Sequence, residues 1–106
     1  MSLRLAVHLT LHVLIPGAVA NLGFKNQWKK AWLIMLATMA VDLDHLLATP
    51  VFDPNRCSIG FHPLHSAAAI CCYLILTVIP QSRIIGAGLL IHMGVDALDC
   101  VWINAL

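Results

Sequence analysis

The sequence predicts an all-α fold: a four-helix transmembrane bundle with a polar His/Asp layer in one half of the membrane. Of the 106 residues, 60% are hydrophobic and 10% are charged, and the mean hydropathy is +0.88. Soluble domains carry about 25% charged residues. The apolar runs are about 18–22 residues long, near the length that crosses ~30 Å of hydrocarbon. The ionisable residues inside these runs all fall towards the same side of the bundle.

A single integral membrane domain spanning residues 1–106 is expected, with helices at about 3–22, 28–48, 63–80 and 83–104. The first helix is followed by the basic stretch KNQWKK, and Pro63 is well suited to the first turn of the third. The fourth contains three glycines that permit close helix approach, namely Gly86, Gly88 and Gly94.

Residues 1–20 also allow a different interpretation, because Ala18-Val19-Ala20 is similar to a signal-peptidase site. His8 and His12 interrupt the apolar region, however. A retained helix is therefore favoured over a cleaved signal.

Basic residues indicate the orientation, because cytoplasmic connections carry an excess of Lys and Arg. One side of the bundle has four cations (Lys25, Lys29, Lys30 and Arg83) and the other has two (Arg4 and Arg56). Both termini and the 49–62 loop are therefore expected outside, with the polar layer on the external side. The net charge of +1 gives no indication of a nucleic-acid partner.

The four cysteines lack the paired CxxC spacing of a zinc site. Helix packing is the favoured interpretation for them. Cys57 is the exposed candidate for a disulfide, and its partner cannot be identified from the sequence.

The polar residues form stripes on the expected helices, because positions three or four apart share a helix face. One stripe holds His8 and His12, a second Asp42 and His45, and a third His92, Asp96 and Asp99. Asp44 is rotated roughly 160° from Asp42 on an α-helix, which indicates a bond elsewhere or a place behind the first layer of ligands.

Buried hydrogen-bonded pairs between helices are the plain explanation of a single such residue. For many at one depth a functional site is favoured, because intramembrane ionisable groups are costly and usually functional. One or two divalent cations would compensate the carboxylates, and carboxylate with imidazole suits zinc first, with iron or manganese as alternatives. Asp42 and His45 share the inward face and are expected to be ligands.

The order of motifs resembles membrane-bound, metal-dependent hydrolases of the LexA-regulated inner-membrane type. The motifs are His12, then Asp42-Leu43-Asp44-His45, His62-Pro63-Leu64-His65-Ser66 and His92-x-x-x-Asp96. More distantly, the chain is similar to zinc-dependent phospholipase C. Over most of its length it closely resembles a small uncharacterised bacterial membrane-protein family without an established activity. Pro63 stands where the hydrolases have an arginine.

The hydrolase resemblance implies a phosphoester or lipid-like substrate in a bacterial inner membrane. Carried over by position, it gives Asp42, His45, His65 and Asp96 as the best matches to metal ligands, with His12, Asp44, His62 and His92 next. The predicted metal ligands are His12, Asp42, His45, His65, His92 and Asp96. Asp44 or Asp99 would be the general base and His62 the acid. The loop residues Asp53, Asn55 and Arg56 would meet a lipid headgroup.

Two other functions compete with hydrolysis. One is a non-catalytic metal-binding protein or a metal or proton transporter, which would need ionisable groups through both halves of the membrane. The other is a structural partner subunit. A homodimer is also expected to be possible, through the glycines of the fourth helix.

Overall fold

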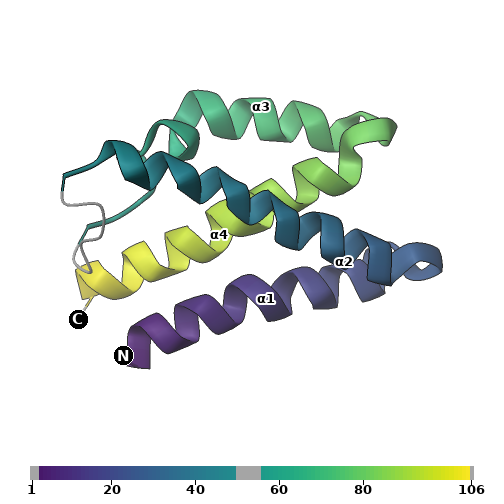
Figure 1. The fold of residues 1–106 in the computed structure, drawn as a ribbon, viewed down its shortest axis with the longest axis horizontal. Coiled ribbons are helices and arrows are strands. Elements are labelled where there is room, and N and C mark those ends of the chain that lie inside the picture. The colour runs from purple at the N-terminus through teal and green to yellow at the C-terminus, as the bar shows by residue number, and fades with distance from the viewer. Residues whose placement is uncertain (1–2, 50–55, 106) are drawn as a thin grey trace.

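The structure is a computed structural model that describes residues 3–49 and 56–105, apart from the side chains of His45 and Ala105. Those residues form four α-helices and four 3-10 helices and contain no strand (Figure 1). The all-α, four-helix prediction is confirmed. The elements are α1 (Leu3–Gly23), η1 (Lys25–Gln27), α2 (Trp28–Ala37), η2 (Thr38–Leu47), η3 (Pro63–His65), α3 (Ala67–Val78), η4 (Pro80–Ser82) and α4 (Arg83–Ala105).

Helix α4 is the centre of the bundle, because it packs against α1, α2 and α3. The start of α1, the end of α4, η2 and η3 lie at one end of the molecule (Figure 1). The α1–α2 and α3–α4 connections lie at the opposite end. Residues far apart in the sequence therefore meet at the end where α1 begins and α4 finishes.

The second expected helix is not α-helical throughout. It changes at Thr38 from α2 to the 3-10 helix η2, which continues to Leu47. At the change, the Thr38 hydroxyl donates a hydrogen bond to the Met35 carbonyl. A 3-10 helix has 3.0 residues per turn and rarely exceeds four residues, so this ten-residue stretch is unusual. It carries both aspartates of the DLDH motif.

The third expected helix begins later than predicted. Pro63 starts the single turn η3, and α3 begins only at Ala67. Ser66 caps α3, since its hydroxyl accepts a hydrogen bond from the Ala69 N–H at 3.2 Å. His65 thus lies outside α3, on the short 3-10 turn η3 that precedes it.

Two glycines of α4 permit close packing inside the chain. A Cβ at Gly86 would collide with Thr77 of α3, and one at Gly88 would lie 2.9 Å from the Met35 Cα of α2. Gly94 is exposed and has nothing within 4 Å of an added Cβ among the described residues. The predicted close approach is thus intramolecular for Gly86 and Gly88.

A disulfide joins Cys57 to Cys100, with a Cα–Cα distance of 4.9 Å. It ties the segment before η3 to the last turns of α4. The packing interpretation is therefore wrong for Cys100, which is disulfide-bonded. Spacing along one helix could not predict this bond, because it does not show which side chain of another segment lies nearby. Cys71 and Cys72 on α3 are free and exposed.

Many large apolar side chains are exposed, while several polar or charged ones are buried. Among the described residues, eighteen large apolar side chains are at least 42% exposed. The interior contains six buried polar or charged residues: His12, Asp44, His62, His65, His92 and Asp96. It contains seven buried hydrophobic ones: Ala20, Ala31, Met35, Val41, Tyr73, Met93 and Val95. The polar groups thus occupy a share of the core that apolar residues normally take.

Candidate metal centre

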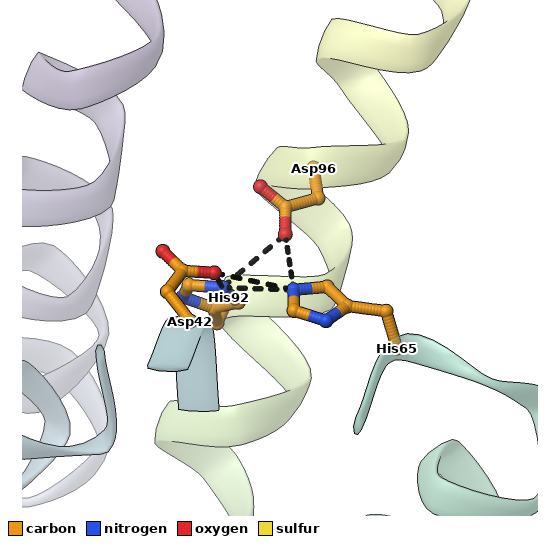
Figure 2. A group of neighbouring side chains, drawn as sticks. All are labelled: Asp42, His65, His92 and Asp96. Carbon is orange, nitrogen blue, oxygen red and sulfur yellow. Dashed lines mark hydrogen bonds and ion pairs between the residues drawn. The ribbon is translucent and has the colours of Figure 1, made fainter. Parts of the chain in front are cut away.

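Four ligand-type atoms from three parts of the chain converge in the interior. They are Asp42 Oδ1 from η2, His65 Nε2 from η3, and His92 Nε2 and Asp96 Oδ2 from α4 (Figure 2). His65 Nε2 lies 3.3 Å from Asp42 Oδ1 and 2.9 Å from Asp96 Oδ2. His92 Nε2 lies 2.9 Å and 3.2 Å from the same two oxygens. The two Nε2 atoms are 3.3 Å apart.

His65 is oriented by contacts behind its ring. Its Nδ1 lies 3.0 Å from Asp44 Oδ2, and the neighbouring Leu64 N–H donates to the same oxygen at 2.9 Å. On the other side, the Leu64 carbonyl accepts a hydrogen bond from the Tyr73 hydroxyl at 2.7 Å. Both backbone groups of Leu64 are thus held, and η3 presents the His65 ring in one direction.

His92 is oriented by its helix and by a thioether. It lies one turn before Asp96 on α4, so both side chains lie on the same face. Its Nδ1 is 3.3 Å from the Met39 sulfur, a weak acceptor, so that nitrogen is the donor. Its Nε2 therefore faces Asp42 and Asp96 without a proton when the ring is neutral.

The same reasoning applies to His65, because an ionised Asp44 only accepts hydrogen bonds. With Nδ1 donating to Asp44, the neutral ring turns an unprotonated Nε2 towards two carboxylate oxygens. Five short contacts then join lone pairs to lone pairs, an arrangement that needs a positive charge at its centre. The surroundings of Asp96 Oδ2 also indicate a cation, because this oxygen is buried and accepts no hydrogen bond from the described residues.

The pKa of His65, which lies outside the regular apolar helices, also indicates that a positive charge is favoured in the group. Burial alone lowers that pKa, but contacts with Asp42, Asp96 and Asp44 outweigh burial and raise it to about 10. The carboxylates thus favour a cation, which is a proton when no metal ion is bound.

The distances fit a tetrahedral metal ion. Five of the six edges of the group measure 2.9–3.3 Å. A regular tetrahedron with edges of ~3.1 Å has its centre ~1.9 Å from each corner, slightly less than the usual Zn–N and Zn–O distance of ~2.0 Å. A metal-bound histidine usually donates its second ring N–H to a carboxylate or a carbonyl. The contact of His65 Nδ1 with Asp44 has this form.

A second group adjoins the first through the other oxygen of Asp96. Asp96 Oδ1 lies 3.0 Å from His12 Nε2 and 3.2 Å from His8 Nε2, and the two Nε2 atoms are 3.1 Å apart. Helix α1 supplies both histidines. His12 thus joins the site beside the first group rather than within it.

The remaining predicted residues lie around these groups. Asp44 contacts His65 from behind, and His62 is buried beside a pocket of about 230 Å³ that Asp44 also lines. Asp99 lies one turn beyond Asp96 and pairs with Arg4 at 3.4 Å. The His45 side chain and the residues Asp53 and Asn55 lie outside the described part of the chain.

Sequence reasoning missed three contributors. His8 was placed in the His8–His12 stripe but not among the ligands, although the i, i+4 spacing was visible. Met39 and Tyr73 orient the site, yet neither residue type nor spacing distinguishes them from packing residues. Only their contacts across the bundle reveal these roles.

A family model described as "Family of unknown function (DUF6122)" matches residues 2–103. No match was found among curated proteins or among solved structures. The expected uncharacterised family is confirmed, over nearly the whole chain. The match carries no activity, and it gives no support to the resemblance to metal-dependent hydrolases.

Proposed function

Since the chain belongs to this family of unknown function, we propose a function from its own residues: an integral membrane, metal-dependent hydrolase that acts on a phosphoester or lipid-like substrate at the external face of a bacterial inner membrane. The observation that carries the proposal is the convergence of Asp42, His65, His92 and Asp96 on one point. Zinc is the first candidate for the ion.

The membrane setting is supported by burial rather than by helix length alone. Leu3–Gly23 and Pro80–Asn104 are long and apolar enough to cross a membrane, but the core helix of a soluble protein passes the same test. A core helix is mostly buried, whereas only 17% of the α1 window is buried inside the structure. Lipid around α1 accounts for this exposed apolar surface.

The external position of the site is supported by the disulfide. Cys57–Cys100 lies at the end of the molecule where α1 begins and α4 finishes. Disulfides persist in oxidising compartments such as the bacterial periplasm. The excess of lysines in the opposite connections favours the same orientation.

Hydrolysis is supported by the surroundings of the two groups. Zinc held by these histidines and aspartates would lower the pKa of a bound water and polarise a phosphoryl or acyl oxygen of the substrate. Asp42 is the ligand with access from outside, since its side chain is 38% exposed. In this proposal Asp99 would accept a proton and His62 would donate one, as general base and acid.

A lipid-like substrate is supported by an apolar groove of about 380 Å³ between η2 and α4. Its lining includes Val41, the residue before Asp42, together with Ile85 and Leu89 of α4. An acyl chain in this groove would bring its headgroup end close to Asp42. The groove thus links the apolar exterior to the most accessible ligand.

Transport of a metal or proton is less well supported. All six buried polar or charged residues among the described ones belong to the histidine–aspartate cluster or adjoin it. A transport route would continue with further polar groups towards the α1–α2 and α3–α4 connections. A flux assay in liposomes separates the two functions, because only a transporter moves the ion across.

The direct test is elemental analysis of protein purified in detergent without a His-tag, followed by assays of phosphoester and phospholipid hydrolysis. Wild-type protein and the exposed-cysteine control Cys71→Ser should bind a divalent metal and hydrolyse the substrate. Asp42→Ala and His65→Ala should lose metal and activity together. Metal-free wild-type protein with intact histidines would overturn the proposal.

A further inference from the structure

We propose that the centre is dinuclear: a second divalent cation is held by His8, His12 and Asp96 Oδ1, and the Asp96 carboxylate bridges the two ions. This inference rests on the proposed metal centre. It specifies which residues would hold the second ion, and it infers that this ion, rather than the first, has a coordination position free for water.

The second group has the dimensions of a ligand set. Its three atoms form a triangle with sides of 3.0, 3.1 and 3.2 Å. His12 and Asp96 are 2% and 4% exposed, so water does not compensate them. Helix bundles build metal sites from imidazoles and carboxylates on facing helices. Here two imidazoles lie four residues apart on α1, and the carboxylate comes from α4.

Protons alone cannot satisfy this triangle. If both Nε2 atoms donate to Asp96 Oδ1, two N–H groups face each other across 3.1 Å. If His8 donates to His12 instead, the contact between His12 and Asp96 joins two lone pairs. A cation in the middle makes all three contacts favourable at once.

The bridging role follows from the two oxygens of Asp96. Oδ1 belongs to the triangle with His8 and His12, and Oδ2 belongs to the group with Asp42, His65 and His92. One short carboxylate thus faces both groups, and two-metal hydrolytic sites hold their ions about 3.5–4 Å apart. No other described side chain belongs to both groups.

The two positions differ in how many ligands the chain supplies. The first has four, which fills a tetrahedron, and the second has three, which leaves a position open as in catalytic zinc sites. Beside His8 lies a small cavity of about 30 Å³ that Asp99 and Trp102 also line. Its lining is mostly apolar, and His8 and Asp99 are the ionisable residues along it. We assign the reacting water to the second ion because its ligand set leaves one position open, and Asp99 lies near His8 of that set.

Metal stoichiometry tests this assignment. Elemental analysis of zinc-loaded protein should give two equivalents per chain in the wild type and one in His8→Ala. The matched control is His62→Ala, which removes a buried histidine outside both groups and should retain two. Manganese-loaded wild type should show the EPR signal of a spin-coupled pair, replaced in His8→Ala by that of isolated Mn²⁺.

One equivalent in the wild type, or two in His8→Ala, would overturn the second position and leave the proposed function standing. A wild type without metal would overturn both. Should His8→Ala fail to fold, the EPR measurement on wild-type protein decides alone, because an uncoupled signal excludes a carboxylate-bridged pair.

Discussion

At the scale of single residues, the site depends on which nitrogen of each histidine faces inward. Asp44 accepts from His65 Nδ1, and Met39 accepts from His92 Nδ1. Both rings therefore present Nε2 to the carboxylates. The spacing of Asp42 and Asp44 indicated different directions for the two side chains. It could not show that both would reach the same histidine, one at each ring nitrogen.

Asp44→Asn should weaken binding of the metal ion at the His65 group by about 10–100-fold, because this carboxylate fixes the tautomer of His65 and raises the basicity of Nε2. Competition with a chromophoric chelator measures the change. Asp99→Asn makes the same chemical change at a carboxylate that pairs with Arg4, and it should leave binding of the ion at the His65 group unaffected. Equal weakening in both variants would show that Asp44 acts only through its charge.

At the scale of elements, the ends of the helices set the geometry of the site. The apolar runs correctly predicted four helices, because length and composition are local properties. The 3-10 stretch η2 and the separate turn η3 were not predictable, since both depend on contacts with distant residues. Leu64, for example, is held by Asp44 and by Tyr73.

Gly88→Ala should destabilise the bundle by about 1–3 kcal/mol, the usual cost of adding atoms to a packed interior. The added Cβ would lie 2.9 Å from the Met35 Cα, so helix backbone has to move. Thermal unfolding in detergent measures the effect. Gly94→Ala is the matched control, because its Cβ meets nothing among the described residues and alanine favours a helix by up to ~1 kcal/mol. Equal stability of the two variants would contradict the close contact.

At the scale of the whole molecule, the disulfide and the exposed apolar side chains are the two features on which the proposed orientation rests. Large apolar residues are exposed around a core that includes six polar or charged side chains, and Cys57–Cys100 marks the end near the site. The proposed external position of that end makes a prediction about topology that is independent of the metal.

In a chain with Cys57→Ser, Cys71→Ser and Cys72→Ser, a membrane-impermeant maleimide should label Cys100 in intact spheroplasts. The first change frees this thiol at the end that is proposed to be external, and the other two remove the exposed background cysteines. As a control, Lys25→Cys in a chain without the other cysteines should be labelled only after lysis, since Lys25 lies in the opposite connection. Labelling in the reverse pattern would invert the orientation.

The sequence by itself determined the all-α class, the number of helices and the collection of histidines and aspartates at one side of the bundle. These follow from hydrophobic run length and from residue spacing, which act within one segment. Only the tertiary structure decided the grouping around Asp96, the ring orientation of His65 and the pairing of Cys57 with Cys100. Each of these depends on distances between segments that are tens of residues apart, and a one-dimensional pattern does not contain such distances.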